Sequence, residues 1–267
     1  MPTAYAEVIG DPVVHSKSPA IHRFWLRKLG LKGDYRALRL SASELPRYFA
    51  KRRRDIFWRG CNVTAPLKLA AARALGGAGP VNLVVRTPLS ALLGANSDIA
   101  GIAHVLDGID LRGEKAVVIG CGGAALAALA ILRAGGAAPI ILLVRDPAKA
   151  APLAGEGIGA RPLGEAGEAL AGARLLVNAT PLGAAHGPAM PEAVLANLAA
   201  MAQDAGVMDM VYDPAETALL AAARAAGLGA IDGLAMLIGQ AAPSFELFFA
   251  AAPPRQFDGE LRGLLAR

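Results

Sequence analysis

A hydroxyl, an amide and an amine lie within the seven residues Asn62-Val63-Thr64-Ala65-Pro66-Leu67-Lys68. The amine is the group best suited to chemistry, because partial burial or cationic neighbours can bring a lysine with an ordinary pKa of about 10.4 into the range of proton transfer. A lone lysine after a proline in a loop is more often an exposed charge. Lys68 therefore needs partners elsewhere in the chain before it has a role.

Two hydroxyls precede a predicted helix near the N-terminus. Ser16 and Ser18 lie just ahead of a helix expected over Ala20–Leu29, with Pro19 at its first turn and Gly30 as its C-terminal cap. Hydroxyls and free backbone amides at such a position can hold an anion. The alternative is that Ser18 only caps the helix, and the pattern alone slightly favours the cap.

A glycine-rich turn opens the second half of the chain. The strand predicted at Lys115–Ile119 meets Gly120-Cys121-Gly122-Gly123-Ala124-Ala125, and an apolar helix, Leu126–Leu132, and a strand, Ile140–Val144, follow. This order and length are typical of a dinucleotide-binding unit. The turn reads G-x-G-G-A-A and not the usual G-x-G-x-x-G, with Ala125 at the position of the third glycine or alanine. The turn therefore predicts a cofactor site.

The residues after that second strand bear on the ribose of the cofactor. Arg145 and Lys149 favour the 2′-phosphate of NADP, whereas Asp146 can accept hydrogen bonds from an unphosphorylated ribose. We predict NADP, with NAD as the alternative. Arg145 as a plain surface charge is the third interpretation.

The elements that must position these groups alternate along the chain. Strands are predicted at Ala4–Ile9, Tyr35–Leu40, Cys61–Val63, Val81–Arg86, Lys115–Ile119, Ile140–Val144, near Leu175–Asn178, at Val207–Tyr212 and at Ala230–Gly233. Helices are predicted between most of them, including an alanine-rich one from Lys68 to Leu75, one that opens at Ser43, one that begins near Pro214 and a long apolar one over Leu234–Phe249. The pattern predicts an α/β fold with a parallel or mostly parallel sheet.

Composition argues against a disordered chain and against a nucleic-acid-binding surface. A chain of 267 residues with 54% hydrophobic content can bury a substantial core. Much of the net charge of +5 comes from the run Lys51–Arg54, which is followed at once by Asp55 and fits a solvated helix end better than a nucleic-acid surface.

The cysteines and the apolar runs favour a soluble, cytoplasmic protein. Cys61 and Cys121 provide no disulfide framework and no C-x-x-C pair for zinc or redox chemistry. No secretory signal is visible, and the most apolar run, Ala116–Leu132, is shorter than the ~20 residues that span a bilayer. We expect a small-molecule substrate, no nucleic acid, no membrane and no metal.

Eight motifs, in order along nearly the whole chain, resemble those of the shikimate dehydrogenase family. They are Ser16-Lys17-Ser18-Pro19, Asn62-Val63-Thr64 with Pro66 and Lys68, Val81-Asn82, Asn96-Ser97-Asp98, Gly120 to Ala124, Asn178-Ala179-Thr180, Asp209-Met210-Val211-Tyr212, and Asp232 to Met236 with Gln240. The resemblance implies NADPH-dependent reduction of 3-dehydroshikimate to shikimate. It also implies two domains, an open α/β substrate domain (1–98, completed by 240–267) and a Rossmann dinucleotide-binding domain (99–239), with the active site in the cleft between them.

The same resemblance implies the roles of individual residues. Lys68 and Asp98 are expected as the catalytic pair. Substrate-binding residues are Ser16, Ser18 and Tyr212 for the carboxylate, and Thr64, Asn82 and Gln240 for ring hydroxyls. Cofactor-binding residues are Gly120, Cys121, Gly122, Gly123 and Ala124 for the pyrophosphate, Arg145 and Lys149 for the 2′-phosphate, and Thr180, Met210 and Gly233 around the adenosine or nicotinamide.

The chain departs from the family pattern at several positions. Ser97 replaces a threonine, Leu83 replaces a hydroxyl residue, and Gly76–Pro80 shortens the segment between Lys68 and Asn82; Val144 and Asp146 depart near the cofactor arginine. Two alternatives follow, a paralogue acting on quinate or an aminated analogue with NAD, and a non-catalytic ligand-binding protein. The sequence leaves open whether the protein is a monomer or a homodimer.

Overall fold

The computed structural model describes residues 3–266, which form two units. Unit 1 comprises Met1–Gly101 and Leu237–Arg267, and unit 2 comprises Ile102–Met236. Within residues 3–266, no helix is long and apolar enough to cross a membrane.

Unit 1 contains a five-stranded sheet in the order β2-β1-β3-β4-β5. Its strands are β1 (Tyr5–Gly10), β2 (Asp34–Arg39), β3 (Trp58–Val63), β4 (Leu83–Arg86) and β5 (Leu92–Ala95). The first three are parallel, whereas β4 runs antiparallel to β3 and to β5. Because β1 and β3 are parallel neighbours, Gly10 and Val63 end their strands at the same edge of the sheet.

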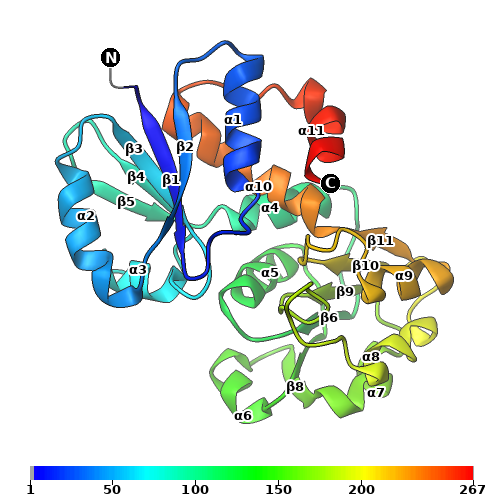
Figure 1. The fold of residues 1–267 in the computed structure, drawn as a ribbon. Coiled ribbons are helices and arrows are strands. Elements are labelled where there is room, and N and C mark those ends of the chain that lie inside the picture. The colour runs from blue at the N-terminus through cyan, green and yellow to red at the C-terminus, as the bar shows by residue number, and fades with distance from the viewer. Residues whose placement is uncertain (1–2, 267) are drawn as a thin grey trace. The chain divides into compact units, whose positions relative to one another are not determined.

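Helices cover both faces of this sheet, as Figure 1 shows. They are α1 (Ser18–Lys28), η1 (Ala42–Glu44), α2 (Leu45–Arg53), α3 (Lys68–Ala74), the start of α4 (Asp98–Val105), most of α10 (Gly233–Phe249), η5 (Arg255–Phe257) and α11 (Asp258–Leu265). Alternation along β1 explains the two layers, because successive side chains point to opposite faces. Ala6 and Val8 pack with Phe248 of α10, while Tyr5 and Ile9 pack with Phe49 of α2.

Unit 2 contains a six-stranded, wholly parallel sheet in the order β11-β10-β9-β6-β7-β8. Its strands are β6 (Ala116–Ile119), β7 (Ile140–Val144), β8 (Ile158–Pro162), β9 (Leu175–Asn178), β10 (Gly206–Asp209) and β11 (Gly229–Ile231). Numbered from β6, this is the strand order of dinucleotide-binding α/β folds, which bind their ligands at the carboxyl ends of the central strands. The predicted fold class is confirmed.

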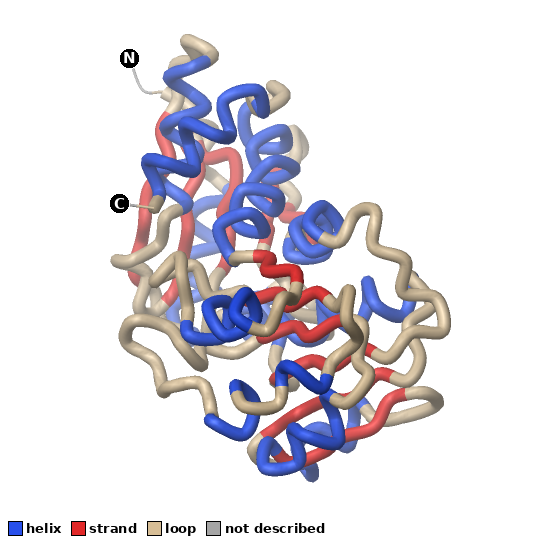
Figure 2. The backbone as a smooth tube through the Cα atoms, turned by 90° about the vertical axis from the view of Figure 1, so that its right-hand side faces the viewer, coloured by secondary structure: helices blue, strands red, loops and turns tan. Residues whose placement is uncertain are grey.

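Helices also lie on both sides of the second sheet, and Figure 2 shows helices around the strands of each unit. They are α5 (Gly123–Ala134), α6 (Pro147–Ala150), η2 (Ala151–Leu153), η3 (Leu163–Glu165), α7 (Ala166–Leu170), α8 (Glu192–Leu195), η4 (Leu198–Ala200) and α9 (Ala218–Ala225). Leu129 of α5 packs with Val118, while Leu170 of α7 and Leu219 of α9 pack with Val117 on the opposite face.

The core of unit 1 contains both tryptophans of the chain. Trp25 and Trp58 are fully buried, and neither indole N–H has a hydrogen-bond partner among residues 3–266. His22 is fully buried beside Trp25 and stacked on Tyr35 with ring centroids 4.0 Å apart, and neither of its ring nitrogens has a hydrogen-bond partner in the described part of the chain. Burial lowers the pKa of His22 to about 3, so its ring is neutral in the folded protein at pH 7.

Candidate functional site

An ion pair joins the start of two helices in unit 1. Lys68 is the first residue of α3 and Asp98 the first of α4, and Nζ of Lys68 donates to Oδ2 of Asp98. The Lys68 side chain is 20% exposed and that of Asp98 8%, so the pair is largely shielded while the amine remains accessible. Asp98 is thus the partner that Lys68 required.

Asn82 holds the other oxygen of the Asp98 carboxylate. Its Nδ2 donates to Oδ1 of Asp98 at 2.7 Å, and its own Oδ1 accepts from the backbone N–H of Ser97 at 2.6 Å. Asn82 is only 3% exposed. The two oxygens of Asp98 therefore have different partners. The bond from Asn82 to Oδ1 fixes the carboxylate so that Oδ2 faces Lys68.

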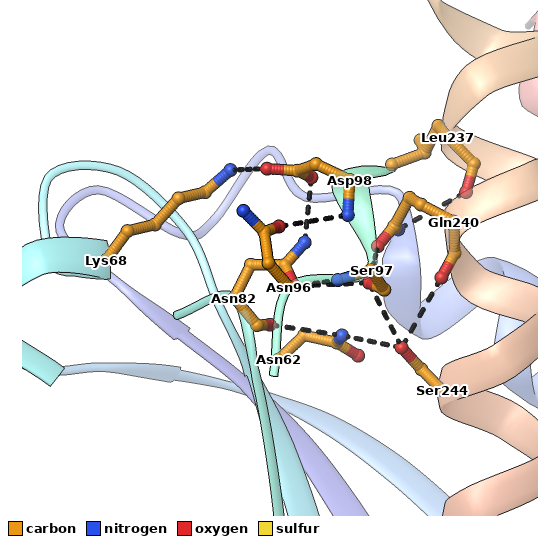
Figure 3. Close-up of polar contacts among 9 residues, drawn as sticks. All are labelled: Asn62, Lys68, Asn82, Asn96, Ser97, Asp98, Leu237, Gln240 and Ser244. Carbon is orange, nitrogen blue, oxygen red and sulfur yellow. Dashed lines mark hydrogen bonds and ion pairs between the residues drawn. The ribbon is translucent and has the colours of Figure 1, made fainter. Parts of the chain in front are cut away.

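The next side chain in this cluster comes from α10. Oγ of Ser97 donates to Oε1 of Gln240 at 2.9 Å, and Nε2 of Gln240 donates to the carbonyl of Leu237 at 3.2 Å. Figure 3 shows Lys68 approaching the cluster from one side and Gln240 from the other. Four of the predicted site residues, Lys68, Asp98, Asn82 and Gln240, are brought together in unit 1.

A second layer of hydrogen bonds lies beneath these residues (Figure 3). Nδ2 of Asn62 donates to Oγ of Ser244 at 2.9 Å and to the carbonyl of Asn82 at 3.3 Å, and Oδ1 of Asn62 accepts from the Tyr35 hydroxyl at 2.6 Å. Ser244 is fully buried and Asn62 is 5% exposed. This layer anchors the backbone of Asn82, which directly precedes β4. Asn62 comes from β3 and Ser244 from α10.

Ser16, Ser18 and Thr64 are the remaining predicted site residues of unit 1. The N-cap of α1 is Lys17, with no side-chain cap, so the alternative in which Ser18 only caps the helix is wrong. The backbone N–H of Ser18 instead donates to Oγ of Ser16 at 3.3 Å. Thr64 follows β3, where the glycine at position 10 leaves room for its methyl group.

A cavity of about 480 Å³ lies at the carboxyl ends of β6 and β7 in unit 2. Its lining consists of Ile119 to Cys121, Leu143 to Asp146, Lys149, Leu163, Thr180 to Leu182 and Pro188. This edge is where a parallel dinucleotide-binding sheet receives its ligand. The cavity thus brings together the predicted cofactor residues Gly120, Cys121, Arg145, Lys149 and Thr180.

The glycine turn fits tightly against the loop after β9. Gly120 has φ +111°, and a Cβ there would lie 2.7 Å from Cγ2 of Thr180. Gly122 is the N-cap of α5, which begins at Gly123, and a Cβ at 122 would meet nothing within 4 Å. The packing of the protein therefore requires a glycine at position 120 but not at 122. The open space at Gly122 leaves room for a ligand at the N-terminus of α5.

Three charged residues follow β7 at the rim of this cavity. Oδ1 of Asp146 accepts from the N–H of Ala148 at 3.1 Å and caps α6, so one oxygen of the predicted ribose acceptor is engaged. Arg145 and Lys149 are exposed, and neither makes an ion pair within residues 3–266. The local charge available to a ligand is therefore mainly positive.

The other predicted residues of unit 2 lie after β10 and at the start of α10. Burial and the neighbouring Asp213 raise the pKa of Tyr212, which keeps its phenol protonated. Gly233 approaches the backbone so closely that a Cβ there would lie 2.7 Å from the carbonyl oxygen of Met210. Asp232 caps α10 through the N–H groups of Leu234 and Ala235.

Two departures from the family pattern have structural explanations. Leu83 is 2% exposed and packs with Val8, Tyr35 and Phe248, so its side chain belongs to the apolar core on that face of the sheet. In the shortened segment α3 ends at Ala74, and the φ of +82° at Gly76 allows the N–H of Gly77 to bond the carbonyl of Ala72 at 2.8 Å.

The sequence did not reveal the polar residues that support the cluster. Ser97, Asn62 and Ser244 are all buried in it, yet none was predicted to have a role. Ser97 carried a signal, because it keeps a hydroxyl where the family has threonine. Ser244 lies one turn after Gln240 on an apolar helix and carried no signal of its own.

Comparison with known proteins identifies the family. The family model described as the shikimate dehydrogenase substrate binding domain matches residues 8–79. The shikimate dehydrogenase (NADP(+)) of Sphingopyxis alaskensis is 46% identical, and the match covers 98% of this chain and 96% of that protein. The protein of the same name from Methylobacterium radiotolerans is 40% identical over 94% of this chain and 93% of its own length.

Solved structures agree with this result along the full chain. The shikimate 5-dehydrogenase of Thermus thermophilus, in complex with NADP(H) and shikimate, superposes with a TM-score of 0.81 at 35% identity, covering 98% of this chain and 100% of that one. The shikimate dehydrogenase of Mycobacterium tuberculosis gives a TM-score of 0.80 at 31% identity over 98% and 99%. The chain therefore belongs to the shikimate dehydrogenase family.

Proposed function

We propose that this protein is an NADP-dependent shikimate dehydrogenase that interconverts 3-dehydroshikimate and shikimate, with Lys68 and Asp98 as its catalytic pair. The observation that carries the proposal is the shielded Lys68–Asp98 ion pair, surrounded by the amides of Asn82 and Gln240. Relatives that match nearly the whole chain bear this name, and one solved relative holds NADP(H) and shikimate.

The ion pair suits the reduction of a ketone. NADPH, when bound, supplies the hydride. Negative charge then grows on the ketone oxygen, and the ammonium of Lys68 both stabilises this charge and gives up a proton from Nζ. Asp98 orients the amine and stabilises its charged form, while Asn82 keeps the carboxylate in place. In the reverse direction, Lys68 receives the proton from the shikimate hydroxyl.

The substrate also needs a carboxylate site and hydroxyl partners. In this proposal, Ser16, Ser18 and Tyr212 bind the carboxylate, and Thr64, Asn82 and Gln240 bind ring hydroxyls. The hydroxyls of Ser18 and Thr64 have no hydrogen-bond partner within residues 3–266, so they are available to a ligand. Neutral donors of this kind suit a polyol.

The cofactor cavity of unit 2 fits NADP. The tight turn at Gly120 and the open space at Gly122 suit a pyrophosphate at the start of α5. Arg145 and Lys149 would hold the 2′-phosphate, while Asp146 is engaged as a helix cap. Cys121, Gly123 and Ala124 complete the turn, and Thr180, Met210 and Gly233 complete the surroundings of the nucleotide.

The structure does not favour the quinate and NAD alternative raised by the sequence. The quinate and NAD alternative came from Leu83 and Asp146, but Leu83 lies in the apolar core and Asp146 caps a helix. We infer that the enzyme works in the cytoplasm on free small molecules, as a monomer or homodimer. Its two cysteines are unpaired, as expected in a reducing compartment.

The deciding experiment compares wild type with Lys68→Met in NADP⁺ reduction by shikimate and in NADPH oxidation by 3-dehydroshikimate. Loss of the amine should lower kcat by about 10²–10⁴-fold in both directions, because general acid–base catalysis and charge stabilisation go together. Binding of NADP⁺, measured by calorimetry, should be unchanged. Arg73→Met, an exposed cation at the other end of α3, serves as the matched control.

The assay also tests each of the two substrates, shikimate and quinate, with each of the two cofactors, NADP⁺ and NAD⁺. Turnover of quinate at the rate of shikimate, or equal use of NAD⁺, would replace the proposed substrate or cofactor. A wild-type protein that binds shikimate but turns over none of the four combinations would support the non-catalytic alternative.

A further inference from the structure

The amide group of Asn82 has only one orientation that satisfies its neighbours. The backbone N–H of Ser97 only donates, so the Asn82 atom 2.6 Å from it must be the carbonyl oxygen. The amide nitrogen then faces the carboxylate oxygen of Asp98, an acceptor, at 2.7 Å. Both ends of the amide therefore require the same orientation.

The amide group of Gln240 is fixed by the same reasoning. Its nitrogen lies 3.2 Å from the carbonyl oxygen of Leu237, which only accepts. Its oxygen lies 2.9 Å from Oγ of Ser97, so the Ser97 hydroxyl must donate to it. Ser97 is 4% exposed, and its Oγ is farther from Oδ1 of Asn82, at 3.2 Å, so its single proton is directed to Gln240.

Ser97 is thus the residue that contacts both amides. Its N–H fixes Asn82, and its hydroxyl fixes Gln240. With both amide oxygens occupied within the protein, each NH₂ group has one hydrogen bond and one hydrogen left over among the described residues. The Lys68 amine, which also only donates, lies on the same carboxylate.

We propose that Ser97 is a positioning residue for substrate specificity: it turns the N–H groups of Asn82 and Gln240 towards the ligand and their oxygens away from it. Which ligand is bound rests on the proposed function; the orientation of the amides does not. The site then accepts a ring only where the ring offers oxygen acceptors at these two amides, as hydroxyl groups do.

An amino group in place of such a ring hydroxyl is the ligand that this arrangement rejects. Protonated, it has only donors, so it meets two N–H groups and the Lys68 ammonium. The acceptor beside them, the Asp98 carboxylate, is already bonded by Lys68 and Asn82. Buried donors left facing each other lose their hydrogen bonds to water without replacement, and sites of this kind discriminate strongly. We expect wild type to prefer shikimate over the amino-for-hydroxyl analogue by more than about 100-fold in kcat/KM.

The test measures this preference, the ratio of the two kcat/KM values, in wild type, Ser97→Ala, Ser97→Thr and Ser244→Ala. In Ser97→Ala the Gln240 oxygen loses its donor, so the amide can rotate and offer that oxygen to an ammonium. The preference should fall at least about tenfold, the effect of one hydrogen bond. Ser97→Thr keeps the hydroxyl and should keep the preference.

Ser244→Ala is the matched control. Ser244 is a buried serine of the same cluster that bonds Asn62 and the backbone carbonyl of Gln240. Its hydroxyl also lies 3.5 Å from Oγ of Ser97, but it contacts neither side-chain amide in question. Both alanine variants should lose thermal stability, because Ser97→Ala leaves the buried Gln240 oxygen without its donor and Ser244→Ala removes one acceptor from the buried Asn62 amide. Only Ser97→Ala should lose discrimination. Equal preferences in the two variants, or a wild type that converts both ligands equally well, would overturn the proposal.

A second measurement separates this inference from the proposed function. In ¹⁵N-labelled protein, the Gln240 side-chain NH₂ should give two sharp resonances in wild type and Ser97→Thr, and exchange-broadened ones in Ser97→Ala. Gln240→Glu assigns the pair by removing it. If wild type failed to oxidise shikimate, the function would be wrong while this spectrum still tested the orientation; an unchanged Gln240 signal in Ser97→Ala would refute the positioning role alone.

Discussion

Asn82 donates from Nδ2 to Oδ1 of Asp98 over 2.7 Å, and this bond determines which carboxylate oxygen is left for the lysine. The other end of the same side chain, Oδ1 of Asn82, accepts a hydrogen bond from the backbone N–H of Ser97. One amide therefore links the polypeptide that precedes α4 to the ion pair at the start of that helix. A substrate hydroxyl bound at Asn82 would meet an amide that is already immobilised, which lowers the entropy lost on binding.

Replacing this amide should impair activity and stability together. Asn82→Ala leaves the buried Ser97 N–H without a partner, which costs about 1–3 kcal/mol of unfolding free energy. It also frees the Asp98 carboxylate, and a displacement on the order of 1 Å can lower kcat by about 100-fold. Asn96→Ala is the control, since Asn96 contacts Asp98 only at its backbone N–H. Steady-state kinetics in which both variants lose kcat equally would contradict the role of Asn82.

Cofactor preference should depend on the two cations after β7. Removal of Arg145 or Lys149 should weaken NADP⁺ binding by about ten- to hundredfold, the effect of a charge-assisted hydrogen bond, and leave NAD⁺ binding nearly unchanged. Asp146→Asn should change the preference little, because its carboxylate already caps α6. Calorimetric titration with both cofactors checks this. A switch to NAD⁺ caused by Asp146→Asn, and not by the cation variants, would reverse the assignment.

The glycine turn allows structural and ligand effects to be separated. Gly120→Ala places a methyl 2.7 Å from Thr180 at a φ of +111°, so the free protein should unfold at lower temperature. Gly122→Ala meets nothing within 4 Å, so the free protein should keep its Tm while NADP⁺ affinity falls. Melting curves with and without NADP⁺ distinguish the two. Normal cofactor affinity in Gly122→Ala would place the pyrophosphate elsewhere.

His22 should make the folded protein sensitive to acid. Its pKa is about 3 in the folded state against about 6.5 unfolded, so the unfolded chain binds the extra proton first. Stability is unaffected above pH 6.5 and falls as pH drops from 6.5 towards 3, by up to about 1.4 kcal/mol per pH unit. His22→Phe, which keeps an aromatic ring against Tyr35, should remove this part of the pH dependence. Denaturant unfolding at pH 7, 6 and 5 measures the difference; parallel curves for the two proteins would contradict it.

Repeated local signals made the sheet elements predictable, and weak ones concealed two strands. The β-branched run of β6, followed by glycines, indicates a strand and turn without tertiary information. By contrast, β5 contains Gly94 and β8 contains Gly159 and Pro162, residues that are poor strand formers. Both strands lie at sheet edges, where neighbouring strands and not local preference decide their pairing.

Site residues that belong to short sequence motifs could be predicted, whereas those that depend on contacts between distant positions could not. Lys68 and Asp98 each belong to a short, recognisable motif, so the resemblance was enough to pair them across 30 positions. Ser97 bonds Gln240 across 143 positions and Asn62 bonds Ser244 across 182. Contacts at such separations depend on how α10 packs on the sheet, and no periodicity along the chain encodes them.

The two buried tryptophans give the molecule a fluorescence signal that belongs to one unit only. Trp25 and Trp58, the only tryptophans in the chain, both lie in the core of unit 1. Their emission should therefore be blue-shifted in the native state and move to longer wavelength when that unit opens, while unit 2 contributes no tryptophan emission. Circular dichroism detects helices in both units. Comparing the two signals in one denaturant titration would show whether units 1 and 2 unfold as one cooperative block or in succession.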